Sequence, residues 1–312
     1  MTYSIVARDP VTGDIGVAVQ SHYFGVGRVV TWGLAGVGVV ATQSIVEVSY
    51  GPKGLALMEQ GLSARAALDQ LLALDEGSAR RQVSMMTATG SVATHTGTAC
   101  IAAAGHQLGD QVSVQANLVE SAELWPAMID AFSTATGDLA QRMLAALVAA
   151  EACGGDIRGR QSAAMLIVRG QATGQLAKDR ILDVRVDDAA DPLGELARLI
   201  ANVQALGGLV ALLEAPGLLS GEFTATPHEV DSALIELANA QTVLGDANRE
   251  PTVWRGLLLA RAGRDAEAIE SFRSATEVDR RVSVLVQRLA DAGMWSRPQA
   301  DLDVIIAQTD AP

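Results

Sequence analysis

Residues 2–21 read TYSIVARDPVTGDIGVAVQS, and this stretch decides the fold of the N-terminal part of the chain. Two runs rich in strand-forming residues flank the segment PVTG at 10–13. This pattern predicts a β-hairpin that holds Thr2 at the mouth of a sheet. Because the predicted turn is at 10–13, Ser21 lies opposite the start of the first strand, and we expect its hydroxyl group near Thr2.

Thr2 directly follows Met1. Methionine aminopeptidase commonly removes an initiator methionine before a small residue, and Thr2 would then carry a free α-amine beside its hydroxyl group. An α-amine with a pKa of roughly 7.7–8.0 is partly neutral near pH 7, so Thr2 would hold both a nucleophile and a base. The alternative is that Met1 is retained and that Thr2 is only the edge of a strand.

The remaining pattern predicts two groups of strands with a pair of helices between them. The elements do not alternate as βαβα, which argues against a Rossmann-like parallel sheet and for a layered α+β fold. The predicted strands are 29–32, 37–43, 82–88, 91–95, 111–116, 163–169 and 181–187, and the predicted helices are 63–75, 121–135 and 138–153.

The chain is predicted to divide into a domain at 1–210, a linker at 211–227 rich in Gly, Pro, Ser and Thr, and a helical tail at 228–312. Part of the tail resembles a tetratricopeptide repeat. A stable array needs about three repeats, so we expect a small helical module with one repeat-like hairpin. It would serve as a protein-partner surface, an oligomer contact or a structural cap. The positions that match are Gly256, Leu259, Gly263, Ala268, Phe272 and Ala275.

Seven blocks of the N-terminal region carry a further resemblance. They are SIVARDPVTGDIGVAVQS (4–21), AGVGVVATQS (35–44), YGPKGL (50–55), HTGTAC (95–100), GH (105–106), VQANLV (114–119) and GGDIRGRQSAA (154–164). In this order and spacing they resemble a bacterial family catalogued as domain of unknown function 1028, whose fold is similar to the N-terminal-nucleophile (Ntn) hydrolases. The resemblance covers about residues 1–210 and implies a four-layer αββα sandwich that cleaves a C–N amide-type bond with Thr2.

Other residues supply the remaining groups that such a reaction needs, and Ser21 and Asn117 form the predicted catalytic set with Thr2. Asn117 ends a predicted strand and is the best candidate to stabilise the oxyanion, although an Asn there equally caps a turn. In the block 154–164, Arg158 would hold a substrate carboxylate, while Asp156 would orient Arg158 or the terminal ammonium. Ser162 belongs to the same predicted substrate-binding set. The alternative interpretation is a helix end followed by an Asp–Arg surface pair.

His95 and His106 lie close in sequence to Cys100, and we assign the two histidines to the substrate pocket. The spacing fits no standard metal site and lacks a fourth ligand, so we expect no bound metal. No nucleotide-binding glycine motif is present, and we expect no cofactor. A cysteine or internal-serine amidase that uses Cys100 or Ser4 is the enzymatic alternative to Thr2.

The composition excludes several classes of partner. The 312 residues contain 36 acidic and 23 basic side chains and carry a net charge of −13, so phosphate backbones and anionic lipid would repel the chain. We therefore expect neither nucleic-acid nor membrane partners, and the uncharged run 29–46 is interpreted as two buried strands. Two cysteines and an N-terminus without signal-peptide features predict a cytoplasmic protein.

These observations predict an Ntn-hydrolase-like enzyme that cleaves a small amide or a short peptide. We also expect homo-oligomerisation, because an exposed apolar sheet layer favours self-association. The non-enzymatic alternative is a catalytically silent scaffold that binds ligands or protein partners.

Overall fold

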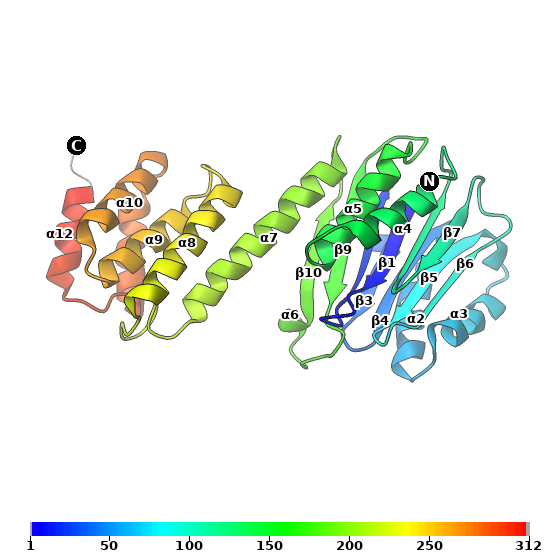
Figure 1. The fold of residues 1–312 in the computed structure, drawn as a ribbon, viewed down its shortest axis with the longest axis horizontal. Coiled ribbons are helices and arrows are strands. Elements are labelled where there is room, and N and C mark those ends of the chain that lie inside the picture. The colour runs from blue at the N-terminus through cyan, green and yellow to red at the C-terminus, as the bar shows by residue number, and fades with distance from the viewer. Residues whose placement is uncertain (1, 310–312) are drawn as a thin grey trace. The chain divides into compact units, whose positions relative to one another are not determined.

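The structure, a computed structural model, describes residues 2–309 and is shown in Figure 1. The chain forms two compact units, one ending at Ile200 and the other beginning at Ala201. This boundary lies inside helix α7 (Pro192–Glu214). The sequence suggests a later boundary, at residue 210, which lies in the same helix. The reason is that α7 is one continuous helix, so no change in local pattern marks the division.

The first unit contains a six-stranded antiparallel sheet with the strand order β10-β9-β2-β1-β8-β7. The hairpin predicted at residues 2–21 forms, with β1 pairing with β2 and Thr2 opposite Ser21. Strand β8 flanks β1 on the other side. The strands are β1 (Thr2–Arg8), β2 (Ile15–Ser21), β7 (Gly105–Gly109), β8 (Val112–Asn117), β9 (Ser162–Val168) and β10 (Arg180–Val186).

A four-stranded antiparallel sheet has the order β3-β4-β5-β6. It faces the first sheet across an apolar core that includes Val6, Val19 and Val39. Its strands are β3 (Thr31–Leu34), β4 (Gly38–Ser44), β5 (Arg81–Thr87) and β6 (Val92–Thr96). The α+β class that the sequence predicts is therefore confirmed, and the sheets are antiparallel rather than Rossmann-like.

Helices cover the outer faces of the two sheets (Figure 1). On the six-stranded sheet, α4 (Leu124–Thr134) and α5 (Leu139–Ala152) bury side chains such as Phe132 and Met143 against β1 and β8. On the four-stranded sheet, α2 (Tyr50–Glu59) and α3 (Ala64–Ala73) pack against β4, β5 and β6.

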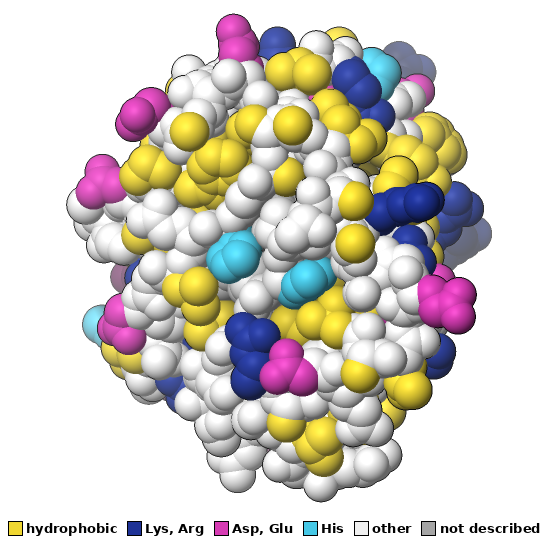
Figure 2. All heavy atoms as spheres, turned by 90° about the vertical axis from the view of Figure 1, so that its right-hand side faces the viewer, with side chains coloured by type: hydrophobic (Ala, Val, Ile, Leu, Met, Phe, Trp, Pro, Cys, Tyr) yellow, Lys and Arg dark blue, Asp and Glu magenta, His cyan; other side chains and the backbone are white. Residues whose placement is uncertain are grey.

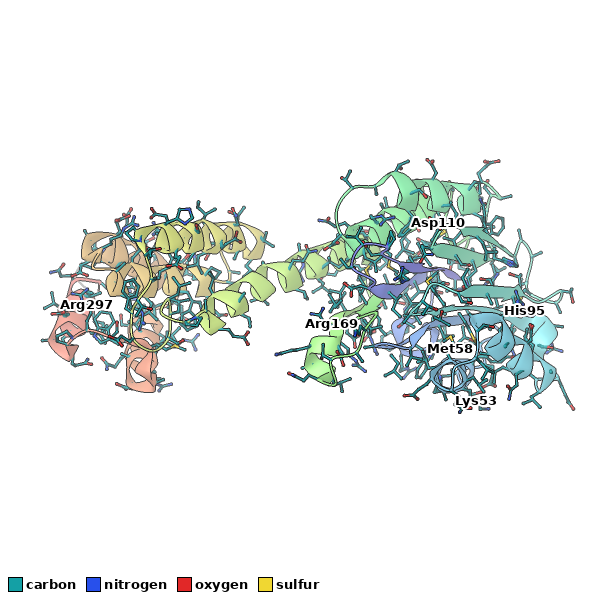
Figure 3. The ribbon with its side chains drawn as sticks, turned by 60° about the horizontal axis from the view of Figure 1, so that its bottom comes forward. Lys53, Met58, His95, Asp110, Arg169 and Arg297 are labelled. Carbon is teal, nitrogen blue, oxygen red and sulfur yellow. The ribbon has the colours of Figure 1, made fainter. Side chains whose placement is uncertain are left out.

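Helix α2 is absent from the sequence prediction because two glycines and a proline conceal it. A Cβ atom at Gly51 would lie 2.3 Å from Cγ of Trp32, so only glycine permits this close packing. Lys53, in the block YGPKGL, lies on this helix, as Figure 3 shows. Strand β7 and two four-residue helices, α1 (Gly27–Val30) and α6 (Leu176–Asp179), were also not predicted.

The second unit is helical, as predicted. The segment 211–227, which the sequence suggests is a linker, is instead partly buried: Leu218 and Leu219 lie in the core of this unit. Buried Arg261 donates hydrogen bonds to the carbonyl oxygens of Leu218 and Gly221, each at 2.7 Å, and so holds the segment in place. The helices are α8 (Pro227–Leu244), α9 (Glu250–Arg261), α10 (Asp265–Val278), α11 (Val282–Leu289), a short π-helix (Ala290–Met294) and α12 (Gln299–Thr309).

Among residues 2–309, α7 is long and apolar enough to cross a membrane by length and composition, although helices of soluble proteins also meet this criterion. The uncharged run 29–46 contains β3 and β4. Strand β4 is buried along most of its length, as expected, whereas β3 is only partly buried and its Leu34 is exposed. The first part of that run differs from the prediction, because residues 29 and 30 belong to α1.

A chain that ends at Asn202 should fold. Within the described residues, the three apolar clusters of the first unit contain no residue after Ile200. We expect cooperative thermal unfolding, measured by circular dichroism. The truncation should change the free energy of unfolding by no more than ~1 kcal/mol, so the Tm should lie within about 4 °C of the same transition in the full chain. A chain ending at Ala190 is the control and should be much less stable, because it lacks buried Leu193 and Leu196. Non-cooperative unfolding of the longer chain would contradict the division into units.

Candidate active site

Thr2 occupies the end of the central strand β1, between the ends of two neighbouring strands. It pairs with Ser21 of β2 on one side and with Asn117 of β8 on the other. The Thr2 Oγ1 and Ser21 Oγ atoms are 3.0 Å apart and share a hydrogen bond. The structure thus brings together all three residues that the sequence analysis named as catalytic candidates.

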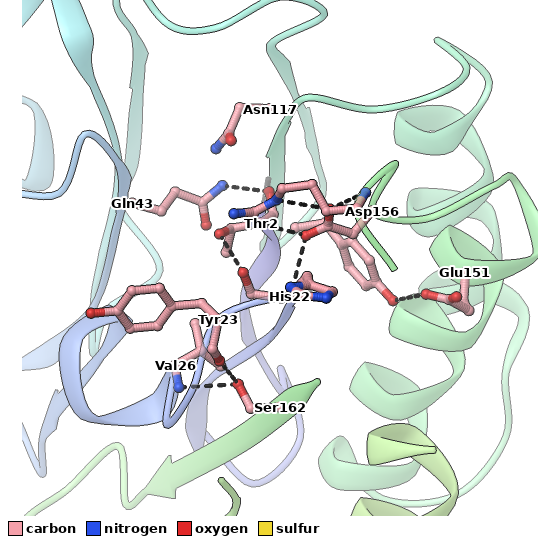
Figure 4. Close-up of polar contacts among 12 residues, drawn as sticks. Thr2, His22, Tyr23, Val26, Gln43, Asn117, Glu151, Asp156 and Ser162 are labelled. Atoms are coloured by element: carbon pink, nitrogen blue, oxygen red, sulfur yellow. Dashed lines mark hydrogen bonds and ion pairs between the residues drawn. The ribbon is translucent and has the colours of Figure 1, made fainter. Parts of the chain in front are cut away.

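The segment after α5 crosses the end of β1. Asp156 accepts a hydrogen bond from the backbone N–H of His22 at 2.9 Å and forms a β-bridge with Val119. Since His22 follows Ser21 and Val119 follows Asn117 by two residues, Asp156 spans the two strands that flank Thr2 (Figure 4). The carboxylate of Asp156 therefore lies near Thr2, at the N-terminal end of β1.

Arg158 forms an ion pair with Asp156, with a distance of 3.2 Å between Nη2 and Oδ2. The Arg158 backbone N–H also donates to the same carboxylate at 2.9 Å. The Asp–Arg pair expected from the block 154–164 is therefore present. It is not only a surface pair, because the Asp156 side chain is fully buried and Arg158 lines a pocket beside Thr2.

The pocket has a volume of about 190 Å³. Thr2, Ser21 and Asn117 contribute to its wall at the strand ends, and valine and isoleucine side chains supply most of the rest. The complete lining is Thr2, Ser21, Tyr23, Val26, Val29, Val30, Gln43, Ser44, Ile45, Val46, Ile101, Asn117, Leu118 and Arg158.

Two non-glycine residues of the pocket wall adopt left-handed backbone conformations, Ser44 with a φ of 75° and Leu118 with a φ of 56°. Such conformations cost free energy and cluster at functional sites. The Ser44 hydroxyl group is also buried and has no hydrogen-bond partner among the described residues. Both features identify this pocket as the candidate functional site.

Buried glutamines connect the two sheets beneath Thr2. Gln43 of β4 donates from Nε2 to the Thr2 carbonyl oxygen at 3.1 Å, and its Oε1 accepts from Ser4 at 2.7 Å. Gln82 of β5 accepts at Oε1 from Gln43 at 2.8 Å and from Asn117 Nδ2 at 3.0 Å. The side chain of Asn117 is therefore held by the opposite sheet.

The orientation of this network follows from its fixed acceptors. Nε2 of Gln82 donates to the carbonyl oxygens of Gly105 and Ala116, both at 3.0 Å, and carbonyl oxygens cannot donate. The Gln82 oxygen must then face Asn117, which in turn must present its NH₂ group. One N–H of that group bonds Gln82, and the amide holds a second N–H.

Tyr3 supports the same strand from the opposite side. Its side chain is buried beneath α5, and its hydroxyl group donates to Oε2 of Glu151 at 2.7 Å. Burial, reinforced by the hydrogen bond to Glu151 and the charge of that residue, raises the pKa of Tyr3. The phenol therefore stays protonated and holds β1 against the helix layer.

Ser162, His95 and His106 do not line the pocket. Ser162 is buried, accepts from the Val26 N–H at 3.1 Å and donates to the Tyr23 carbonyl oxygen, so it holds the segment 22–26 that forms one pocket wall. In this structure Ser162 therefore supports a pocket wall and does not itself line the pocket.

The two histidines lie on strands β6 and β7, and Figure 3 labels His95. Figure 2, which views the right-hand side of Figure 1, shows histidine side chains with mainly uncharged and hydrophobic side chains around them. His95 bonds the Ser78 carbonyl oxygen at 3.0 Å, and His106 bonds the Thr96 hydroxyl group at 2.8 Å. Burial, with smaller effects of the charges of His95 and Arg65, lowers the pKa of His106. Neither ring is among the groups that meet at Thr2.

The alternative nucleophiles lack the required surroundings. The Cys100 thiol bonds the Arg81 carbonyl oxygen at 3.3 Å, and no hydrogen bond joins it to either imidazole in the described part of the chain. Ser4 is completely buried between the sheets and is held by Gln43 and Gln115. Residues 2–309 contain no group of three His, Cys, Asp or Glu side chains suited to a metal ion.

The model of a family of unknown function, DUF1028, matches residues 2–196. The match covers more than half of the 312 residues and corresponds to the first compact unit. The chain belongs to this family. This DUF1028 chain is similar to the crystal structure of protein SPO2555 from Silicibacter pomeroyi, also described as DUF1028, with a TM-score of 0.58 and 29% identity over 64% of this chain and 87% of that chain. No curated protein matches the chain.

Sequence reasoning missed Gln43 and Gln82 of the DUF1028 region. A signal was present, because each is a large polar residue in a run predicted to be a strand. Polar side chains at such positions need partners, and here the partners come from the facing sheet. The sequence does not reveal which strand faces which, so the network itself was not predictable.

Replacing Gln82 by Leu should destabilise the protein. The substitution leaves the buried Asn117 amide and the Gly105 and Ala116 carbonyl oxygens without this partner. We expect the free energy of unfolding to fall by about 3 kcal/mol, measured by urea denaturation. Gln60→Leu, at an exposed position, is the control and should change it by less than ~0.5 kcal/mol. Equal effects of the two substitutions would show that the network contributes nothing to stability.

Proposed function

We propose that this protein is an Ntn-type amidohydrolase in which Thr2 becomes the nucleophile after Met1 is removed. The observation that carries the proposal is the position of Thr2 at the wall of a pocket, hydrogen-bonded to Ser21 and flanked by Asn117. Met1 lies outside the described residues. The reaction would hydrolyse a C–N amide-type bond in a small molecule or a short peptide.

The bond-making and proton-transfer steps use the hydroxyl group and the α-amine of Thr2, at the start of β1. Oγ1 of Thr2 attacks the amide carbonyl carbon while the α-amine takes the hydroxyl proton, directly or through water. The C–N bond then breaks, and the leaving nitrogen receives that proton. Water attacks the resulting ester, which releases a carboxylic acid and restores the hydroxyl group of Thr2.

The neighbouring side chains have separate roles in this proposal. The second N–H of the Asn117 amide would stabilise the oxyanion, because Gln82 already fixes the orientation of that amide. Ser21 would orient the Thr2 hydroxyl group, and the buried Asp156 carboxylate would attract the α-ammonium group at the strand end. Arg158 would bind an anionic group of the substrate.

Two further expectations belong to this proposal. The helices on the outer faces of two facing sheets support classification of the first unit as an Ntn-like αββα sandwich. Close packing of Gly256 against Phe272, in the hairpin of α9 and α10, supports a tetratricopeptide-like tail that binds a protein partner or a second copy. We also propose a cytoplasmic, homo-oligomeric protein.

Thr2→Ala should remove hydrolysis of any substrate found by screening amides, ureides and short peptides. We expect kcat to fall by at least ~10³-fold because the substitution removes the nucleophile, whereas Thr2→Ser should retain part of the activity. Thr12→Ala, in the exposed hairpin turn, is the matched control and should keep full activity.

Intact-mass spectrometry of the same preparations provides an independent check. The proposal requires a mass lower by one methionine residue than that of the full sequence. Retained Met1 in an active preparation, or full activity of Thr2→Ala, would refute Thr2 as the nucleophile. Inactivity of the processed protein across the whole screen would favour the catalytically silent scaffold.

A further inference from the structure

We infer that the pocket beside Thr2 takes a small amide with a single carboxylate and an apolar side chain, the chemistry of an N-acylated apolar amino acid. This inference specifies the substrate class and rests on the proposed function. Three properties of the pocket support it: its charge, its apolar surface and its size.

The first property is the charge that a ligand would meet. Among the described residues that line the pocket, Arg158 is the only one with a charged side chain. Its side chain is 43% exposed, whereas the Asp156 carboxylate behind it is fully buried. A ligand entering the pocket therefore contacts the guanidinium group rather than the carboxylate. The guanidinium group already donates from Nε and Nη2 to Asp156, and a ligand carboxylate would add a further charge-assisted contact to this pair.

The remaining polar groups do not provide a site for a second charge. The Gln43 amide is occupied by the Thr2 carbonyl oxygen, Gln82 and Ser4. Asn117 donates to Gln82, and Thr2 bonds Ser21. The α-amine of Thr2 acts as the base in the proposed reaction, so a dianionic or cationic ligand would bury a charge without a side-chain partner, which is costly. The lining therefore favours a ligand with one anionic group.

The second property is an apolar floor and an apolar mouth. Val26 and Val30 are almost completely buried and form part of the floor. Tyr23, Ile45 and Ile101 also line the pocket, but they are 46%, 47% and 50% exposed. Exposed apolar side chains gathered at a pocket indicate a binding surface, because a bound apolar group would remove them from water.

The third property is size. The volume of about 190 Å³ is below the ~300–1,000 Å³ of pockets that enclose drug-sized ligands. The pocket therefore accommodates one amino-acid-sized group rather than an extended peptide. The unpartnered hydroxyl group of Ser44 in the same wall provides a further hydrogen-bonding position for the amide of such a ligand.

Isothermal titration calorimetry of the full-length Thr2→Ala variant tests this inference without turnover. The probes are N-acetyl-L-leucine, N-acetyl-L-leucinamide, N-acetylglycine and N-acetyl-L-glutamate. We expect N-acetyl-L-leucine to bind at least ~10-fold more tightly than its amide, because the amide lacks the charge that Arg158 binds. We expect a similar advantage over N-acetylglycine, which lacks the apolar side chain, and over N-acetyl-L-glutamate, which has a second carboxylate.

Variants of two neighbouring arginines identify the group that recognises the anion. In the Thr2→Ala background, Arg158→Gln should abolish the preference for the acid over the amide. Arg160→Gln is the matched control, since Arg160 pairs with Glu151 and Asp191 and does not line the pocket. The preference should persist in that variant. Equal binding of acid and amide, equal effects of the two substitutions, or equal binding of the glycine and leucine derivatives would overturn the inference.

The results also separate this inference from the proposed function. Selective binding of N-acetyl-L-leucine without hydrolysis by the wild-type protein would retain the ligand class and refute the amidohydrolase. Thr2-dependent hydrolysis of amides without preference for an anionic apolar substrate would retain the amidohydrolase and refute the ligand class.

Discussion

The pairing of the first residue of β1 with both neighbouring strands is the constraint on which the site depends. Thr2 lies opposite Ser21 and Asn117, so three polar side chains meet at one end of the sheet. The antiparallel register determines that these side chains lie together, since a shift of one residue would turn the side chains of the strand to the other face of the sheet. The segment that carries Asp156 and Arg158 then crosses the end of the same strand. The first residue of β1 therefore lies in the wall of a pocket.

Hydrogen bonds between the facing sheets reinforce that register. Gln43 and Gln82 extend from the four-stranded sheet to Thr2 and Asn117 of the six-stranded sheet. Apolar contacts hold two sheets together without specifying their exact alignment, whereas amides with fixed donors and acceptors tolerate little sliding. The polar network therefore aligns the sheets at the end where the pocket opens, while the purely apolar core lies elsewhere between them.

The second unit contributes a separate core. Its apolar cluster begins with Leu209 of α7 and includes the buried segment around Leu219. The pocket beside Thr2, by contrast, is lined by residues from Thr2 to Arg158. The proposed chemistry and substrate recognition therefore depend on the first unit, which is also the region matched by the family model. The tail is a candidate for assembly or partner binding rather than for catalysis.

The sequence by itself determined the α+β class, the hairpin at residues 2–21 and the opposition of Thr2 and Ser21, because strand pattern and turn position are local properties. It also indicated the block containing Asp156 and Arg158. Only the tertiary structure decided that Ser162, His95 and His106 lie outside the pocket and that Gln43 and Gln82 support it. These assignments depend on which strands face each other across the two sheets. Residues far apart in sequence meet there, and no local pattern encodes that meeting.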